Sequence, residues 1–285
     1  MKPAAFRYFA PRSLDEALDL LAEHGEDGKI LAGGQSLVPA MNFRLARPES
    51  LIDINRIAAL DYVREEAGGL RIGALARHAR FETPIAAGAL GGFLPRVAHH
   101  IAHLPIRVRG TFAGSLAHAD PASEWCLVAA TLDAEIIAAS RRGTRTFPAD
   151  HYFVTTLTTA LGPDEILTEV RLPLLGEEWR AGFAEFSRRA GDYALAMCAA
   201  FLRIEQGRIV EARIGIGGAT DRPARIAAAE RLLVGSDGGT DSRRAAGDAA
   251  AEAIEPLEDL QAGADYRRHL VRAMVERAVA EACVR

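Results

Sequence analysis

The sequence predicts an α+β protein with two α/β subdomains followed by a C-terminal domain that combines a small antiparallel sheet with helices. Three observations support this fold class. An amphipathic helix alternates with short apolar strands near the N-terminus, strand-like segments predominate in the middle of the chain, and alanine-rich helical segments follow a hairpin in the last third. The expected domains are residues 1–56, 57–175 and 176–285.

The N-terminal subdomain is expected to contain one helix whose beginning is marked by a capping box. Ser13 and Glu16 have the spacing at which a hydroxyl and a carboxylate satisfy first-turn N–H groups, and Gly25 provides the end of the helix. Around this helix we expect strands and one short helix, at residues 5–9, 30–32 and 50–54 for the strands and 37–45 for the helix.

The remaining two domains are predicted from alternation and from alanine content. The second is expected to be mostly antiparallel, and the tight Gln206–Gly207 pair predicts a hairpin meander in the third. Expected strands are at residues 71–75, 134–139, 165–172, 182–188, 197–205 and 208–216, and expected helices begin at 76 or span 125–132, 224–233, 242–254 and 266–283.

Size and composition exclude several function classes. The 285 residues, 49% of them hydrophobic, allow a full core, and the net charge of -4 without a basic patch argues against a nucleic-acid partner. No apolar run approaches the ~18 residues that span a membrane, and no signal peptide is evident, so we expect a cytoplasmic protein. Cys126, Cys198 and Cys283 form no C-x-x-C, so we expect no iron–sulfur cluster or structural metal on this chain alone.

A first glycine-rich stretch, A-G-G-Q-S-L at residues 32–37, follows directly after a strand-forming segment. Glycine permits positive φ and lets a ligand approach the main chain, and successive backbone N–H groups in such a loop form a concavity suited to an anion. Phosphate is the anion that we expect such a loop to bind. We expect the pyrophosphate of a ligand to lie against these residues, mainly on main-chain N–H groups, with the hydroxyl of Ser36 adding a contact.

A second stretch, residues 109–124, again combines glycines with small hydroxyl residues and ends in two carboxylates. Two glycine loops with acidic groups that accept hydrogen bonds from ribose or ribityl hydroxyls suggest a dinucleotide. Neither stretch is a G-x-G-x-x-G that opens a helix or a P-loop, so a nicotinamide Rossmann site or an ATPase is disfavoured.

The pair A-G-G-Q-S-L (residues 32–37) and R-G-T-x-x-G-S-L-A-H-A-D-P (residues 109–121) resembles the FAD-binding medium subunit of molybdenum-containing hydroxylases. That family includes aerobic carbon monoxide dehydrogenase, xanthine dehydrogenase and bacterial N-heterocycle and aromatic hydroxylases. The resemblance continues at residues 44–54, 70–74 and 187–194, so it spans nearly the whole chain. It implies an FAD-binding fold of the PCMH type.

The motifs and the resemblance together give a set of expected FAD contacts. The first stretch would hold the pyrophosphate, the second would close the opposite side, the carboxylates would face the sugar or ribityl hydroxyls, and the last positions would lie near the isoalloxazine ring, with one histidine as a hydrogen-bonding partner. In chain order they are Leu31, Ala32, Gly33, Gly34, Gln35, Ser36, Leu37, Thr111, Ala113, Gly114, Ser115, His118, Asp120, Glu124, Leu167, Arg188, Asp192 and Tyr193.

Several of these residues have an alternative interpretation. Asp120 has the position of an N-cap for a helix after Pro121, and Tyr193 could be an ordinary core residue. The family usually has two glycines where this chain has Ala113–Gly114, so the loop keeps its shape only if Ala113 has negative φ. His99 and His103 have a metal-ligand spacing, but no acidic third ligand accompanies them, and an amphipathic helix is the better interpretation.

No Ser-His-Asp, paired-carboxylate or Cys-His arrangement is evident, so we assign no catalytic residue. The resemblance implies that hydroxylation occurs at a molybdenum cofactor on a large subunit and that [2Fe–2S] clusters on a small subunit deliver electrons to FAD on this chain, in a dimer of heterotrimers. The alternatives are a self-sufficient FAD-dependent oxidase or dehydrogenase, for whose covalent flavin only His118 is available, and a nucleotide-binding scaffold.

Overall fold

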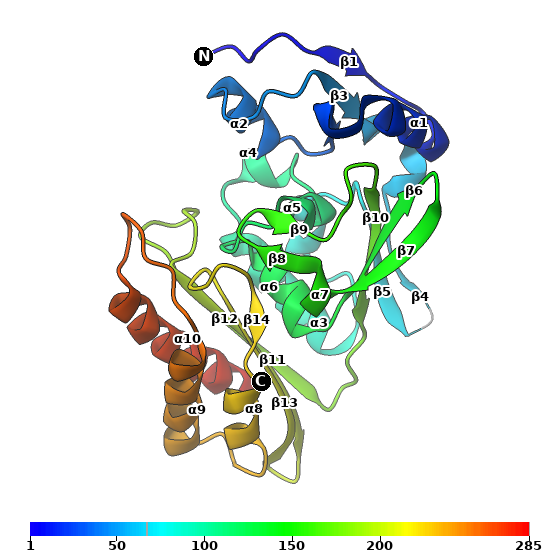
Figure 1. Ribbon diagram of the computed structural model, residues 1–285. Coiled ribbons are helices and arrows are strands. Elements are labelled where there is room, and N and C mark those ends of the chain that lie inside the picture. The colour runs from blue at the N-terminus through cyan, green and yellow to red at the C-terminus, as the bar shows by residue number, and fades with distance from the viewer. Residues whose placement is uncertain (67, 285) are drawn as a thin grey trace.

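The computed structural model describes residues 1–66 and 68–284, which form three successive layers of structure (Figure 1). The first unit contains a parallel sheet in the order β1-β3-β2, with β1 at Arg7–Phe9, β3 at Ser50–Asp53 and β2 at Gly28–Leu31. Helix α1 (Leu14–His24) packs on this sheet, and the short helix α2 (Leu37–Asn42) follows β2. The α/β character expected for this part of the chain is confirmed.

The predicted cap of α1 is confirmed, with one difference. The Ser13 hydroxyl accepts a hydrogen bond from the Glu16 N–H at 3.1 Å. The Glu16 carboxylate, however, accepts from the N–H of Arg12 at 2.8 Å, one residue before the position that the capping box specifies. Both groups therefore fix the entry into α1.

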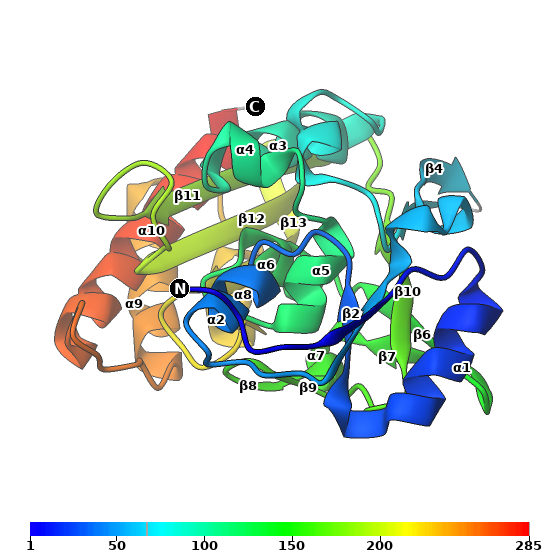
Figure 2. The same cartoon turned by 90° about the horizontal axis from the view of Figure 1, so that it is seen from above.

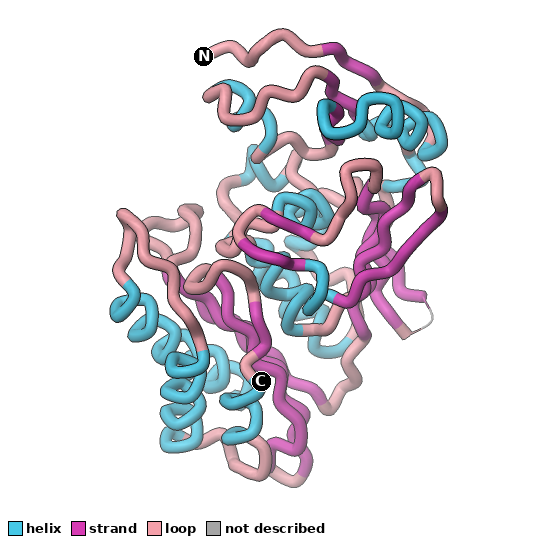
Figure 3. Tube along the Cα trace, viewed as in Figure 1, coloured by secondary structure: helices cyan, strands magenta, loops and turns pink. Residues whose placement is uncertain are grey.

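The second unit is built on a five-stranded antiparallel sheet in the order β4-β5-β10-β6-β7. Its helices lie beside this sheet (Figures 1 and 3). The elements are β4 (Val63–Glu66), β5 (Gly69–Gly73), β6 (Glu135–Ser140), β7 (Gly143–Pro148), β10 (Ile166–Pro173), a small hairpin of β8 (Phe153–Thr155) and β9 (Thr158–Thr159), and helices α3 (Gly88–His100), α4 (Leu104–Arg107), α5 (Phe112–His118), α6 (Glu124–Thr131) and α7 (Ala149–Tyr152).

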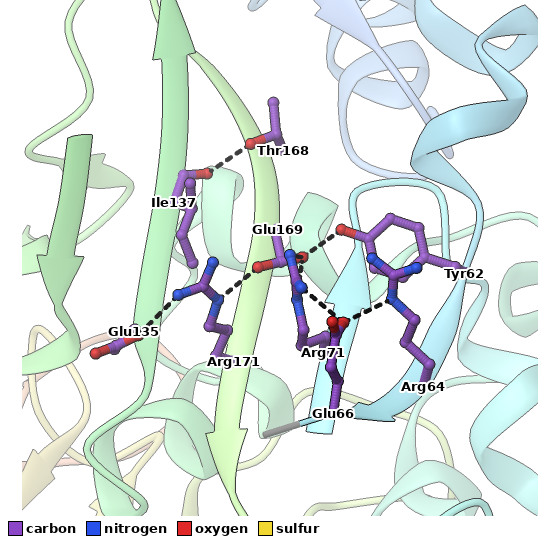
Figure 4. A network of polar contacts seen from close by, with 9 residues as sticks. All are labelled: Tyr62, Arg64, Glu66, Arg71, Glu135, Ile137, Thr168, Glu169 and Arg171. Carbon is purple, nitrogen blue, oxygen red and sulfur yellow. Dashed lines mark hydrogen bonds and ion pairs between the residues drawn. The ribbon is translucent and has the colours of Figure 1, made fainter. Parts of the chain in front are cut away.

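One buried carboxylate organises the polar contacts on this sheet (Figure 4). Glu169 of β10 is 3% exposed and accepts hydrogen bonds from Tyr62, from Arg71 Nε at 2.8 Å and from Arg171 Nε at 2.6 Å. The two guanidinium groups bond in turn to the more exposed carboxylates of Glu66 and Glu135. These contacts link β5, β10 and β6 in addition to their backbone ladders.

The third unit is an antiparallel sheet in the order β11-β12-β13-β14 that packs between helices on both faces (Figures 1 and 2). Helices α8 and α10 cover one face and α3 and α6 of the second unit cover the other, so the second and third units share a core. The bounds are β11 Trp179–Phe186, β12 Ala196–Glu205, β13 Arg208–Gly217, β14 Ala224–Arg225, α8 Ala227–Leu233, α9 Thr240–Ala253 and α10 Ala264–Val284.

The structure corrects several expected elements. Residues 224–225 form β14 instead of the start of a helix, and the helix expected from residue 76 is a 3-10 turn at His78–Glu82. β11 begins at Trp179, earlier than expected, whereas the Gln206–Gly207 hairpin turn is confirmed with φ values of 53° and 75°. Among the described residues, no helix has the length and apolarity needed to cross a membrane.

Candidate functional site

The first glycine stretch forms the predicted turn between β2 and α2. Gly34 has φ of 72°, which a residue with a side chain adopts only with strain. The Gln35 side chain donates to the carbonyl of Gly33 at 3.0 Å, and Asn55 Nδ2 donates to the carbonyl of Ala32 at 2.8 Å. These two hydrogen bonds hold the turn in one conformation and satisfy two of its carbonyl oxygens.

The N–H groups of the same turn are left available. Within residues 1–66 and 68–284, no protein acceptor is found for the backbone N–H of Gly33, Gly34, Gln35 or Ser36. The Ser36 hydroxyl also makes no capping hydrogen bond to α2 in this part of the chain. A row of successive free donors of this kind is suited to the oxygens of a phosphate group.

The two glycine stretches meet at Gly33. A Cβ added to this residue would lie 2.6 Å from the carbonyl oxygen of Arg109 and 2.6 Å from Cα of Gly110. Both are backbone atoms that cannot rotate away, so only glycine fits at this contact. The sequence interpretation that the two stretches face one another is therefore consistent with the packing.

A pocket of about 360 Å³ opens beside this contact and includes residues that the sequence analysis missed. Arg109 lines it and has no ion-pair partner among the described residues. Asp53 is the last residue of β3, and Asn55 follows two residues later. The half-buried guanidinium of Arg77 donates hydrogen bonds to Asn55 Oδ1 and to the carbonyl oxygen of Arg109. Burial, and then the charge of Arg109, lower the pKa of Arg77, so the two guanidinium groups lie close enough to interact, while Asp53 adds one carboxylate to the pocket lining. The pocket is lined by Leu31, Ala32, Gly33, Gly34, Gln35, Val38, Pro39, Asn42, Asp53, Asn55 and Arg109.

Within the second stretch, residues 112–118 form helix α5 instead of the expected loop. Thr111 is the N-cap of α5, and its hydroxyl accepts from the N–H of Gly114 at 3.0 Å. Ala113 is buried inside this helix, where φ is negative, so the condition set for the alanine substitution is met. Ser115 is the middle residue of α5, and His118, partly buried, is its last.

His78 is a buried residue that the sequence analysis also missed, and it contacts Gly110 and Trp125, which belong to the second stretch and to α6. Trp125 Nε1 donates to His78 Nδ1 at 2.9 Å, so the neutral ring carries its proton on Nε2, next to which a Cβ on Gly110 would overlap. Burial, and then the charges of Arg77 and Arg107, lower the pKa of His78 to about 4. The ring packs with Trp125, which itself contacts the rings of Phe81 and Phe112.

Replacing His78 with leucine is expected to remove part of the acid sensitivity of the fold. Because the folded-state pKa is about 4 and the ordinary value is 6.5, the unfolded chain binds a proton first, and stability is lost as pH falls through this window. Between pH 6.5 and pH 4, the free energy of unfolding should fall by about 3 kcal/mol more in the wild type than in His78→Leu. Urea unfolding at a series of pH values measures this difference, and parallel curves would contradict it.

The acidic segment after α5 forms a turn that leaves one carboxylate oxygen available. Asp120 Oδ1 accepts from the N–H of Ala122 at 2.9 Å, and the N-cap of α6 is Ser123. The alternative in which Asp120 caps this helix is therefore wrong. Burial, and then the charge of Glu185, raise the pKa of Glu124 at the first position of α6.

The loop between β11 and β12 brings a third segment toward these carboxylates. Tyr193 is 66% exposed, so the alternative of core packing is wrong, and desolvation followed by the charges of Asp120 and Glu124 raises the pKa of its hydroxyl. Arg188 and Asp192 are exposed, and Gly191, with φ of 83°, packs against His103. Leu167 lies buried in β10, and its expected contact with the flavin stays a prediction.

The chain was compared with known proteins. Residues 4–175 match the model of the FAD-binding domain in molybdopterin dehydrogenase, and residues 181–282 match that of the CO dehydrogenase flavoprotein C-terminal domain. The nicotine 6-hydroxylase medium subunit of Paenarthrobacter nicotinovorans is 41% identical over 288 residues, which cover 100% of both chains.

Carbon monoxide dehydrogenase gives a match in both sequence and structure. Its medium chain from Hydrogenophaga pseudoflava is 36% identical over 286 residues, which cover 100% of this chain and 99% of the relative. A solved structure of that enzyme, in a form that lacks the Mo-pyranopterin moiety, superposes with a TM-score of 0.95 at 37% identity and covers 100% of this chain and 99% of its own. The chain therefore belongs to the family of FAD-binding medium subunits of molybdenum hydroxylases and is an oxidoreductase subunit.

Proposed function

We propose that this chain binds FAD with the diphosphate on the N–H groups of Gly33 to Ser36 and relays electrons from the [2Fe–2S] clusters of a small subunit to an external acceptor. The row of free N–H donors beside the pocket that Arg109 lines carries this proposal. FAD supplies the chemistry that accepts and releases electrons, and the protein supplies binding, orientation and electrostatics.

The contacts proposed for FAD come from all three units. Arg109 and Arg77 would balance the charge of the diphosphate, and the N-terminal turn of α5 would close on it from the other side. The carboxylate of Asp120 would accept hydrogen bonds from sugar or ribityl hydroxyls, and the carboxyl group of Glu124, whose pKa is raised, would form hydrogen bonds with the same hydroxyls. Tyr193, exposed on its loop and electrostatically linked to both carboxylates, would lie over the isoalloxazine ring.

The proposal assigns the substrate chemistry to other subunits. A large subunit with the molybdenum cofactor would hydroxylate the substrate, and the assembly would be a dimer of heterotrimers in the cytoplasm. The three cysteines form no disulfide in the described structure, which is consistent with a reducing compartment. A relative from Paenarthrobacter nicotinovorans, 41% identical over 283 residues, is named as subunit alpha of a 6-hydroxypseudooxynicotine dehydrogenase complex, which supports a role within a complex.

Purification of the tagged chain from its native host tests this proposal. We expect bound FAD together with one larger and one smaller partner, and molybdenum and iron in metal analysis of the purified material. A lone yellow protein that oxidises a substrate without partners would contradict the relay and favour a self-sufficient flavoenzyme.

Replacing Asp120 with asparagine is expected to weaken FAD binding by ~1.5–3 kcal/mol, about ten- to hundredfold, because one charge-assisted hydrogen bond is lost. Asparagine keeps an oxygen that can accept from the Ala122 N–H, so the turn is preserved. Fluorescence titration of the apo-protein with FAD measures the effect. If Asp120→Ala loses affinity while Asp120→Asn keeps it, the side chain acts only through the turn.

A further inference from the structure

One buried arginine in the last helix joins two segments that are distant in sequence. Arg267 of α10 is 3% exposed. Its Nη1 donates to the carbonyl oxygens of Leu195 and Gly218, both at 2.8 Å, and its Nη2 donates to Asp259 Oδ2 at 2.7 Å. A guanidinium can make these contacts together because its donors lie in one rigid plane.

One of the two carbonyl groups belongs to the end of the loop proposed to contact the flavin, and the other belongs to Gly218, which follows β13 and bonds to the Asp120–Pro121 segment. Leu195 closes the loop that carries Arg188 and Tyr193, since its N–H donates to the carbonyl of Phe186 at 2.8 Å. The N–H of Gly218 donates at 2.8 Å to the carbonyl of Pro121, the residue after Asp120. Arg267 therefore bonds directly to the end of the loop and, through Gly218, is linked to the Asp120–Pro121 segment.

Gly218 also lies directly against the end of the loop. Its φ is 74°, and an added Cβ would lie 2.9 Å from the carbonyl oxygen of Ala194. No side chain fits between the end of β13 and the end of the loop. The spacing between them consequently depends on the backbone at Gly218, whose carbonyl Arg267 holds.

The loop before α10 fixes the other end of the flavin loop. Arg188 donates to the carbonyl of Gln261, and the N–H groups of Gln261 and Ala262 donate to Asp259 Oδ1 at 2.8 and 3.0 Å. Asp259 thus connects Arg267 to the contact of Arg188. Figure 1 shows α10 running beside β11 and β12, the two strands that the loop with Arg188 and Tyr193 joins.

The arginine is not explained by packing alone. Its Nε is buried without an acceptor in the described structure, a cost that an apolar residue at this helical position would avoid. We propose that Arg267 is a positioning residue that sets the spacing between the Asp120–Pro121 segment and the Arg188–Tyr193 loop, and thereby the geometry of the flavin site. This inference rests on the proposed function for its consequence, but the spacing itself can be measured without FAD.

The test compares Arg267→Lys and the milder Asp259→Asn with Val271→Ala in the full-length chain. Val271 is fully buried one turn further along α10 and is apolar, so its truncation weakens the core that it shares with Leu195 but removes no hydrogen bond to either segment. Three quantities are measured: the urea midpoint, amide hydrogen exchange of residues 187–195 and of Gly218, and the affinity of the apo-protein for FAD.

We expect Arg267→Lys to speed exchange in the loop and at Gly218 by about tenfold and to weaken FAD binding by about tenfold, with a smaller effect in Asp259→Asn. Val271→Ala should lower the urea midpoint but leave hydrogen exchange at these residues and the affinity for FAD unchanged. The inference would be overturned if Arg267→Lys and Val271→Ala lost FAD affinity equally. It would also be overturned if hydrogen exchange were unchanged in both Arg267→Lys and Asp259→Asn. A wild-type chain that takes up no FAD would instead refute the proposed function, and the exchange data would still decide the role of Arg267.

Discussion

Replacing Gly33 with alanine is expected to weaken FAD binding by about ten- to hundredfold. The added methyl group would lie 2.6 Å from backbone atoms of Arg109 and Gly110, so the turn after β2 and the second stretch must separate. Overpacking of this kind costs ~1–3 kcal/mol, which corresponds to that loss of affinity if the strain is relieved at the binding turn. The measurement is a flavin fluorescence titration of the apo-protein, with thermal unfolding recorded for the same variant.

Gly92→Ala is the matched control for this prediction. Gly92 lies inside α3, and a Cβ there would meet no atom within 4 Å, so this variant should bind FAD as the wild type does and be slightly more stable. Wild-type affinity in Gly33→Ala would mean that the row of free N–H groups is not the diphosphate site. Gly34→Ala adds a further comparison, because φ of 72° strains any residue with a side chain at that position.

The first binding turn could be predicted from sequence because its signals are local. Strand-forming residues run directly into two glycines, and the structure ends β2 at Leu31 and places Gly34 at positive φ. The start of α1 is another local signal, since Ser13 and Glu16 need only each other and the first turn of the helix. Such features depend on neighbours in the chain, not on the rest of the fold.

The second stretch was predicted wrongly because its glycines are compatible with both a loop and a helix start. Thr111 provides an N-cap, and the apolar residues Phe112 and Leu116, four positions apart, share the buried face of α5. Packing of Phe112 against Trp125 favours this helix in the folded protein despite the low helix propensity of Gly114. The apolar spacing was a signal that could have indicated the helix.

Of the site residues that the sequence analysis missed, Arg109 opens the second stretch, whereas Asn55 and Arg77 have no local signal. Asn55, Arg77 and Arg109 come from separate segments and meet only through hydrogen bonds across the first and second units. His78 is similar, because its partner Trp125 is 47 positions away. A single sequence contains these residues but not their proximity, which arises from the order of strands in the two sheets.

Replacing Glu169 with glutamine is expected to give the largest loss of stability among the variants considered, ~3 kcal/mol. The side chain is 3% exposed and neutralises Arg71 and Arg171, which would then face one another across β5 and β10 without a buried negative charge. Urea unfolding at neutral pH measures the loss. The sheet that carries Leu167, two residues earlier in β10, should weaken first in hydrogen exchange.

Tyr62 provides an independent readout of the same contact. Burial, followed by its hydrogen bond to Glu169, raises the pKa of Tyr62 to about 12, so loss of the carboxylate charge should lower this pKa toward the ordinary value of 10.0. Glu135→Gln is the matched control, because that carboxylate is largely exposed and bonds to Arg171 alone among the residues of Figure 4, so less than about 1 kcal/mol should be lost. If both variants lost the same stability and left the phenol titration unchanged, Glu169 would be one surface charge among others. If only Glu169→Gln lost stability and its Tyr62 pKa fell, the buried carboxylate would be the group that stabilises this sheet. It is the one carboxylate in Figure 4 that contacts Tyr62, Arg71 and Arg171 together.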